Sequence, residues 1–267
     1  MMKTFRVMTF NIRFDKPEEG DRSWDVRKPL VAEAIRQCHP HILGLQEATW
    51  RQIRDLKNLL PDYIFCLKGR VWDDTCQYPT LAYRSSDLQC LENGEFWLST
   101  TPSVHRSKDW GSAFPRMLSY ATFQFIEDGD GQDREFLVGV THLDNKSERA
   151  RLRQANIIVD WFKEQDYPGI VMGDFNEVPD GDVYKALCSS FFVDTWKELG
   201  FPEDESAITH HDFRGSPDVG RLDWILVTHH FMVLNGEIVR FNQEGTYPSD
   251  HFPYYVDVAL KEVDSGT

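Results

Sequence analysis

Short apolar runs of strand length alternate along this chain with segments whose apolar residues recur at helical spacing. Residues 5–12 form one apolar run, residues 29–38 place their apolar side chains on one helical stripe, and residues 42–46 form the next run. Thr49 is a candidate helix N-cap, and Ser147 begins the segment with the clearest helical spacing. Further strands are predicted at 63–67, 80–84, 120–126, 136–142, 170–173, 224–227 and 254–260. This mixture of strands and helices predicts an α/β fold.

The apolar content is large enough for a substantial core. The chain has 267 residues, of which 41% are hydrophobic and 13% aromatic, so disorder outside the termini is not expected. Turn-rich stretches at 15–21, 128–132 and 203–220 lack the composition of a flexible linker, and we find no internal repeat. We therefore predict one domain over residues 1–267, with its core at about 5–260.

The sequence contains neither a predicted membrane span nor a secretory signal. It has no run of about 18 apolar residues, and its first residues lack a long apolar stretch and a small-residue cleavage site. These features predict a cytoplasmic protein without a membrane partner. The five cysteines are scattered, odd in number and without a C-x-x-C pair, which favours buried reduced thiols over a zinc cluster.

The chain is strongly acidic, with a formal net charge of −14. Nucleic-acid binding depends on neutralising phosphates with Lys and Arg, so long duplex DNA is disfavoured as a partner. A phosphorylated small molecule or a short nucleic acid is compatible with this charge, because metal ions can supply positive charge inside a site. The sequence leaves the oligomeric state open.

Polar side chains stand at the ends of five predicted strands. Asn11, Glu47, His142 and Asp174 each follow an apolar run, and Asp223 precedes one. Taken singly, such residues are most often turn, cap or solvated strand-end positions. Five oxygen donors or histidines in the same situation indicate that they converge at a sheet rim, where α/β proteins favour ligand sites.

The donor types in this set point to a metal site. Carboxylate and carboxamide oxygens without thiolates suit Mg²⁺, or alternatively Mn²⁺, better than structural zinc. Glu47 is the best single ligand candidate, and Asn11 is a neutral oxygen donor that completes or orients the same shell. Because Mg²⁺ uses few protein carboxylates, positions remain for substrate phosphate oxygens.

Six short blocks, in this order, resemble those of the endonuclease/exonuclease/phosphatase superfamily, the DNase I-like metal-dependent phosphoesterases. The blocks are Thr9-Phe10-Asn11-Ile12-Arg13, Leu45-Gln46-Glu47, Thr141-His142-Leu143-Asp144, Gly173-Asp174-Phe175-Asn176, Arg221-Leu222-Asp223-Trp224-Ile225 and Ser249-Asp250-His251. They cover essentially the whole chain, and together they are far more specific than any one alone. The resemblance implies a four-layer α-β-β-α sandwich, with two mostly antiparallel sheets, flanking helices and the active site at one end.

The resemblance also implies a metal-binding set. Glu47 and Asn11, with Asp250 nearby, look like the residues that bind Mg²⁺ in this superfamily. A divalent cation there would act as a Lewis acid that polarises the phosphoryl group.

Five further residues take catalytic roles by the same resemblance. Asp174 activates or orients the attacking water, Asn176 donates to a phosphoryl oxygen, and His142 contacts the same phosphate. Asp223 and His251 look like an Asp–His dyad, in which the carboxylate holds one tautomer and stabilises the imidazolium. The sequence leaves open whether Asp174 or His251 is the general base.

Five residues are weaker candidates for substrate binding. Arg13, Arg27 and Arg116 are compatible with contacts to phosphate or to carboxylates that support the site, and equally with surface or structural ion pairs. Tyr83 matches a position near the site in relatives, yet its context favours a packed core aromatic. His211, with His210, lies in a polar loop, where we expect a solvent-exposed pair rather than a second metal site.

These observations predict a Mg²⁺-dependent hydrolase that cleaves a phosphodiester or phosphomonoester by in-line attack of water, assisted by an Asp–His dyad. An exonuclease or deadenylase acting on single-stranded RNA ends is the enzymatic alternative, since a short bound strand tolerates the acidic surface. A catalytically silent scaffold is the alternative from another class. The complete set of site residues argues against the scaffold, because a silent relative is expected to have lost some of them. The identity of the substrate stays open.

Overall fold

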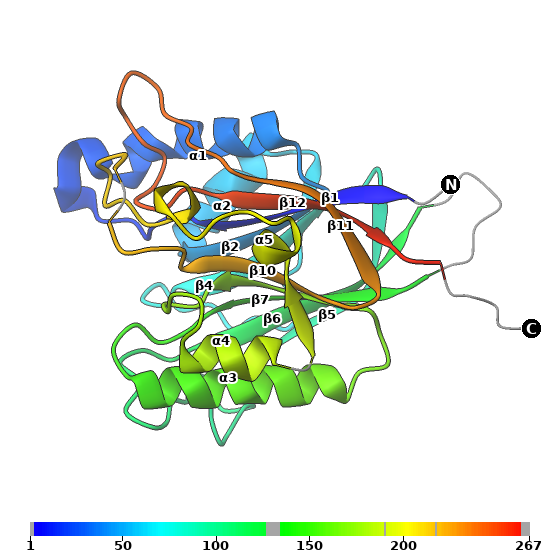
Figure 1. Cartoon of the computed structure of the whole chain (residues 1–267). Coiled ribbons are helices and arrows are strands. Elements are labelled where there is room, and N and C mark those ends of the chain that lie inside the picture. Colours follow the sequence, from blue (N-terminus) through cyan, green and yellow to red (C-terminus); the bar gives the residue numbers. More distant parts are fainter. Residues whose placement is uncertain (1–2, 127–133, 190, 217, 263–267) are drawn as a thin grey trace, which may run out of the picture.

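The computed structural model describes residues 3–126, 134–189, 191–216 and 218–262. Two six-stranded sheets pack face to face between helices, with α1 above the sheets and α3 below them in Figure 1. This is the four-layer arrangement that the sequence predicts. The turn predicted at 128–132 lies outside the described residues.

The first sheet is antiparallel except for one pair of strands. Its order is β11 (Phe231–Ile238), β12 (Tyr254–Leu260), β1 (Thr4–Asn11), β2 (Ile42–Ala48), β4 (Tyr78–Arg84) and β3 (Tyr63–Phe65). Strands β1 and β2 pair in parallel, and every other neighbour pair in this sheet is antiparallel. The helix α1 (Trp24–Cys38) connects the parallel pair.

The second sheet also contains one parallel pair of strands among antiparallel neighbours. Its order is β5 (Leu88–Trp97), β6 (Met117–Phe125), β7 (Phe136–His142), β8 (Gly169–Asp174), β10 (Asp223–Thr228) and β9 (Phe192–Asp194). Strands β7 and β8 form the parallel pair, and the helix α3 (Glu148–Lys163) connects them. The other neighbours are antiparallel, so the prediction of two mostly antiparallel sheets is confirmed.

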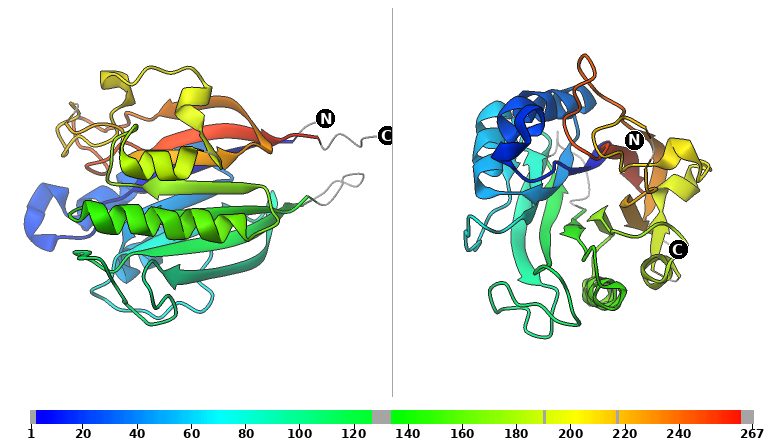
Figure 2. Two further views of the ribbon diagram at one scale, coloured as in Figure 1. Left: turned by 60° about the horizontal axis from the view of Figure 1, so that its bottom comes forward. Right: turned by 90° about the vertical axis from the view of Figure 1, so that its left-hand side faces the viewer.

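Helices cover the outer face of each sheet. The helices α1 and α2 (Trp50–Leu59) pack on the first sheet, while α3 and α4 (Asp182–Cys188) pack on the second, as the right-hand view of Figure 2 shows. Three short helices lie in connections: η1 (Pro17–Arg22), α5 (Thr195–Glu198) and η2 (Glu205–Ala207). The helix caps agree with the sequence, since Thr49 and Ser147 both accept a backbone N–H in the first turn.

No helix among the described residues combines the length and apolarity needed to cross a membrane.

Apolar layers fill the spaces between sheets and between each sheet and its helices. Along β1, Val7 faces the opposite sheet, whereas Met8 and Phe10 face the helices. Both faces of the central strands are therefore buried, which explains why their sequences read as continuous apolar runs rather than as alternating patterns.

The strand directions bring the polar strand ends together. In the first sheet Asn11 lies beside Gln46, the residue before Glu47. In the second sheet Asp174 lies between His142 and Asp223. The two sets meet where the sheets face each other, because the Asn11 side chain reaches Asp174 across the gap.

Candidate active site

An Asp–His–Asp arrangement forms the centre of this cluster. The His251 ring lies with its Nδ1 2.7 Å from Asp223 Oδ2 and its Nε2 3.8 Å from Asp174 Oδ2. All three residues are buried. Asp174 ends β8 and Asp223 begins the neighbouring β10, so sheet pairing sets the spacing of the two carboxylates, while His251 comes from the loop before β12.

The charges in this arrangement stabilise one another. Burial alone would lower the pKa of His251, but the carboxylates of Asp223 and Asp174 outweigh it and raise that pKa to about 10. Burial and the negative charge of Asp223 raise the pKa of Asp174 to about 7, against the opposing effect of His251. One atom of each residue lies within 4.8 Å of the others, a spacing that a metal ion could bridge. A protonated imidazole has no free nitrogen for a metal, so we interpret this trio as a proton-holding group.

His142 approaches the same carboxylate from the adjacent strand. Its Nε2 is 3.4 Å from Asp174 Oδ2. Burial, together with the positive charges of Arg116 and His251, holds the pKa of His142 well below its usual value. The two histidines around Asp174 therefore differ in charge, with His251 protonated and His142 neutral at neutral pH.

Glu47 and Asn11 form the side of the site that belongs to the first sheet. The Asn11 amide nitrogen is 3.0 Å from Asp174 Oδ2 and 3.4 Å from Glu47 Oε1. Glu47 Oε2 accepts the backbone N–H of Phe14 at 3.0 Å. The Glu47 backbone has φ of 62°, an uncommon value for a residue with a side chain, at the irregular end of the β2–β4 pairing. Such strain is typical of residues whose side chain must point in a required direction.

Asn176 lies in the turn that follows β8. It has φ of 51°, a conformation that Asn tolerates better than most residues. Its backbone N–H donates to Asp174 Oδ1 at 2.9 Å, and its side-chain amide donates to the Leu143 carbonyl at 2.9 Å. Asn176 is thus tied both to the central carboxylate and to the loop after His142.

Asp250 and Arg13 pair at the edge of the site. The closest approach is 3.4 Å, between Arg13 Nη1 and Asp250 Oδ2. Burial would raise the pKa of Asp250, but the positive charges of His251 and Arg13 lower it overall. Arg13 also lies 3.6 Å from Glu19, so it has the structural ion pairs that the sequence left as one of two possibilities.

Arg116 is buried beside the site without an ion pair. It precedes β6, and the carboxylates whose charges act on it are those of Glu47, Asp144 and Asp174. Burial lowers the pKa of its guanidinium, against the effect of these carboxylates. The structural ion pair that the sequence allowed for Arg116 is therefore not found among the described residues.

Tyr83 lies in the core, and the histidine pair His210–His211 is less exposed than the sequence predicts. Tyr83 packs in the core between the sheets, with its ring 5.2 Å from that of Phe123. The prediction of an exposed histidine pair was wrong: His211 is 0% exposed and stacks on Phe252 with the ring centroids 3.8 Å apart. His210 is half-buried with its ring 4.9 Å from that of His251. Backbone pairing of this loop with the 250–252 segment, through contacts distant in sequence, buries both rings.

Two further buried residues support the site. Asp144 is fully buried, and its carboxylate accepts hydrogen bonds from two segments that flank the site. Arg27 is also buried; its guanidinium donates to the carbonyls of Ile12, Arg13 and Pro248 and so joins two loops at the site. The sequence assigns no role to Asp144, although it belongs to the Thr-His-Leu-Asp block, whereas Arg27 is a weak candidate that the structure places on backbone carbonyls.

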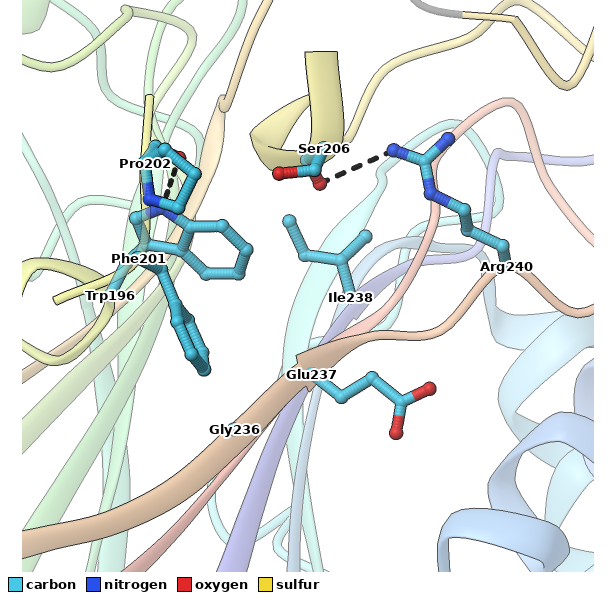
Figure 3. Close-up of a pocket in the computed structure, with 8 residues that line it drawn as sticks. All are labelled: Trp196, Phe201, Pro202, Ser206, Gly236, Glu237, Ile238 and Arg240. Carbon is cyan, nitrogen blue, oxygen red and sulfur yellow. Dashed lines mark hydrogen bonds between the residues drawn. The ribbon is translucent and has the colours of Figure 1, made fainter. Parts of the chain in front are cut away.

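A separate cavity of about 270 Å³ opens beside the edge strand β11 (Figure 3). Apolar groups of Trp196, Phe201 and Ile238 line it, with Glu237 and Arg240 at its polar side. None of the predicted site residues lines this cavity, so it is distinct from the cluster around Asp174.

Comparisons with known proteins agree with the fold. The model of the Endonuclease/Exonuclease/phosphatase family matches residues 8–251. A solved family protein from Bacteroides thetaiotaomicron is 27% identical, with a TM-score of 0.87 over 98% of this chain and 100% of that chain. A mannosyl-6-phosphatase from the same organism is 27% identical, with a TM-score of 0.82 over 95% of this chain and 99% of that chain.

A sequence relative, nocturnin from Xenopus laevis, is 26% identical over 97% of this chain and 74% of its own length. The family match extends from the end of the first strand to His251 and so includes nearly every residue of the buried cluster. The chain therefore belongs to the Endonuclease/Exonuclease/phosphatase family and is a phosphoesterase, a hydrolase of phosphate esters.

Proposed function

We propose that this protein is a Mg²⁺-dependent phosphoesterase in which Asp174 activates water for in-line attack on the phosphorus atom of a small phosphorylated substrate. The observation that carries the proposal is the position of the Asp174 carboxylate. It is buried within 4 Å of His142, His251 and Asn11, next to the strained Glu47. A buried carboxylate surrounded by titratable groups is typical of a functional site rather than of a structural ion pair.

The residues present fit a hard divalent cation. Glu47 would hold it with a carboxylate oxygen, Asp250 is the second acidic candidate, and Asn11 orients Glu47 through its amide. All of these groups offer oxygen or orient it, and no cysteine joins them, which suits Mg²⁺ and also Mn²⁺. When bound, the cation supplies Lewis-acid polarisation of the phosphoryl group.

Asp174, rather than His251, is the proposed general base. The imidazole of His251 lies between two carboxylates, which stabilise its protonated form, and a protonated ring cannot accept a proton from water. Asp174 has an oxygen next to that ring and can take or orient the water proton. Asp223 then keeps His251 in place as a positively charged group beside the phosphate.

Two neighbouring side chains would contact the phosphate oxygens. Asn176 and His142 flank Asp174 on the second sheet, and the hydrogen bond from Asn176 to the Leu143 carbonyl fixes its amide close to His142. A neutral His142 and an amide donor add hydrogen bonds without adding charge. Donors fixed in this way stabilise the oxygens on which charge develops during attack.

The substrate proposal rests on charge and on similarity. The net charge of −14 disfavours long duplex DNA, and a mannosyl-6-phosphatase is among the relatives of high structural similarity. A small phosphorylated compound is therefore the first choice. Single-stranded nucleic-acid ends, the enzymatic alternative from the sequence, form a separate arm of the test below.

The test is a substrate panel with matched variants. Sugar phosphates, nucleotides, short oligonucleotides and p-nitrophenyl esters are assayed with Mg²⁺, Mn²⁺ or EDTA. Asp174→Ala and His251→Ala are each expected to lower kcat by at least about a thousandfold, since such groups act directly in the transition state. Asp180→Asn removes one exposed carboxylate, which pairs with Lys197, and serves as the charge control. Wild-type turnover in either active-site variant, with folding intact, would refute the assignment.

A further inference from the structure

Arg116 has a feature that the proposed mechanism does not use: it is buried, and its guanidinium has neither a hydrogen-bond acceptor nor an ion-pair partner among the described residues. The residue is 7% exposed. Its Nε lies in the interior without a hydrogen-bond acceptor, and no ion pair with its guanidinium is found among the described residues. Burying a charge without a partner costs several kcal/mol, so such a group needs another explanation.

Other buried arginines of the chain show how a structural arginine is satisfied here. Arg27 donates to backbone carbonyls, Arg70 pairs with Glu95, and Arg221 pairs with Asp194 at 2.6 Å. Each of these guanidinium groups has several acceptors. Arg116 differs from them, because the part of the chain that the structure describes offers its guanidinium no acceptor.

The position of Arg116 is fixed by its neighbours rather than by its own contacts. Asp144 Oδ2 accepts the Ser112 hydroxyl at 2.9 Å and the Ala113 N–H at 2.7 Å, while its Oδ1 accepts the Ser147 N–H at 2.7 Å. Asp144 thereby ties the segment 112–116 to the loop that follows His142. The guanidinium is held next to the catalytic cluster while its donors stay free.

The surroundings of Arg116 indicate what it binds. Arg116 immediately precedes β6, in which Leu118 pairs with Thr141, the residue before His142. The carboxylates whose charges act on it are those of Glu47, Asp144 and Asp174, and none of them forms a hydrogen bond with it. A cluster of carboxylates repels an anionic substrate, so a fixed cation is needed beside it. The 53% exposed ring of Phe114 lies 5.6 Å from the guanidinium, which leaves the group next to a solvent-accessible side chain. A planar guanidinium fork is suited to two oxygens of one phosphate group.

We propose that Arg116 binds two non-bridging oxygens of a terminal phosphate and thereby makes the site selective for phosphomonoesters over phosphodiesters. This inference rests on the proposed function. A monoester has three non-bridging oxygens and a second negative charge, so two oxygens remain for the fork while another faces the proposed cation. In a diester the second ester substituent occupies one of these positions, and the charge is lower.

The experiment compares Arg116→Gln and Arg116→Lys with Arg106→Gln. Arg106 belongs to the same connection before β6, is partly exposed and pairs with Asp73 away from the site, so its variant matches the change in charge. The probes are p-nitrophenyl phosphate and bis-p-nitrophenyl phosphate. Arg116→Gln is expected to lower kcat/KM for the monoester by about a hundredfold and for the diester by less than about tenfold. Arg116→Lys keeps the charge without the fork and is expected to be intermediate.

A binding measurement separates this inference from the proposed function. Inorganic phosphate is titrated into the metal-free and Mg²⁺-loaded proteins by calorimetry, and Mg²⁺ affinity and the thermal midpoint Tm are measured alongside. We expect Arg116→Gln to lose phosphate affinity in both forms while keeping Mg²⁺ affinity and a Tm no lower than that of the wild type. A structural arginine would instead lower Tm and leave phosphate binding unchanged.

Each remaining outcome has a defined meaning. Equal losses for both esters would overturn the selectivity, and unchanged phosphate binding would overturn the anion site. A wild-type protein that binds phosphate through Arg116 yet hydrolyses neither ester would refute the proposed function and leave the anion site standing. If Arg116→Gln fails to fold, the monoester-to-diester ratio of Arg116→Lys decides between these outcomes.

Discussion

At position 251 a single imidazole ring faces two carboxylates. Its Nδ1 lies against Asp223 and its Nε2 points towards Asp174. Asp223 comes from the β-strand next to the one that ends in Asp174, so the two acids cannot separate without breaking the sheet. The charge of His251 therefore depends on backbone pairing as much as on the side chains themselves.

Replacing Asp223 with Asn tests this dependence. The substitution keeps the side-chain shape but removes the charge that holds the His251 ring, so we expect kcat to fall by about a hundredfold or more with a smaller change in KM. Steady-state kinetics on the best substrate of the panel measures both constants. Circular dichroism confirms that the variant folds, and an unchanged kcat would show that His251 needs no carboxylate.

His41 gives a prediction about stability rather than catalysis. Its Nδ1 accepts the backbone N–H of Arg6 at 2.9 Å, and burial, followed by the charge of Arg84, lowers its pKa to about 4. The folded protein thus binds the proton more weakly than the unfolded chain, where the pKa is about 6.5. Neutral His41 therefore contributes to the free energy of unfolding above pH 6.5, and this contribution is lost as pH falls from 6.5 towards 4.

The measurement is urea unfolding of wild type and His41→Asn at several pH values. The free energy of unfolding of the wild type is expected to fall by about 2 kcal/mol more than that of the variant between pH 6.5 and 4. His39, which caps the end of α1 and is exposed, provides the control as His39→Asn. Parallel pH curves for wild type and His41→Asn would contradict the prediction.

Among the secondary-structure elements, the parallel pair β7–β8 is built around a glycine. Gly173 has φ of 151°, and a Cβ at this position would overlap the backbone carbonyl of Thr141 on the neighbouring strand. Any side chain here must push the strands apart at the Thr141–Gly173 pair, one residue before the pair formed by His142 and Asp174. The close spacing of these two proposed site residues therefore depends on the absence of a side chain at residue 173.

We expect Gly173→Ala to lower the free energy of unfolding by about 3 kcal/mol and to reduce kcat by about a hundredfold, because the backbone cannot yield as a side chain can. Gly139→Ala on the adjacent strand is the matched control, since its Cβ would meet only side-chain atoms of Leu118 and Phe162, at 3.1 Å. Denaturant unfolding and kinetics on both variants provide the comparison. Equal effects in the two variants would show that the overlap at Thr141 is relieved elsewhere.

The central strands could be predicted from the sequence, and so could the edge strand β3, whereas the edge strands β5, β9 and β11 were missed. The runs predicted at 136–142 and 254–260 match β7 and β12, because strands buried on both faces are apolar throughout. Strand β5 was missed because most of its residues are exposed or half-buried, and β11 was missed for the same reason. The helix predicted at 29–38 begins earlier, at Trp24, so Pro29 lies inside the helix and does not mark its start.

The strand-end residues of the site could be predicted for a similar reason. Asn11, His142, Asp174 and Asp223 each stand where an apolar strand ends or begins, so local sequence shows their place in the sheets. The isolation of Arg116 could not be predicted, because it depends on contacts made by residues distant in the chain. The sequence shows which groups reach the site, and the folded loops determine which of them lack partners.

For the whole molecule, net charge sets how an anionic substrate approaches. A charge of −14 on a protein of 267 residues repels a phosphate ester at long range, while the short-range attraction comes from the site itself. We expect kcat/KM for a dianionic substrate to rise a few-fold when KCl increases from about 10 to about 150 mM at constant free Mg²⁺, as screening weakens the repulsion. A fall in kcat/KM with salt, measured under the same conditions, would show that local attraction dominates the approach.

The direction of the strands separates the chain ends from the catalytic cluster. Strand β1 runs from Thr4 towards Asn11, and β12 runs from the region of His251 out to Leu260, so both ends of the described chain lie at the opposite end of the sandwich (Figure 1). A tag, a surface linker or a fused protein attached at either end would therefore lie away from the cluster around Asp174. Immobilised enzyme prepared through either attachment should keep its turnover.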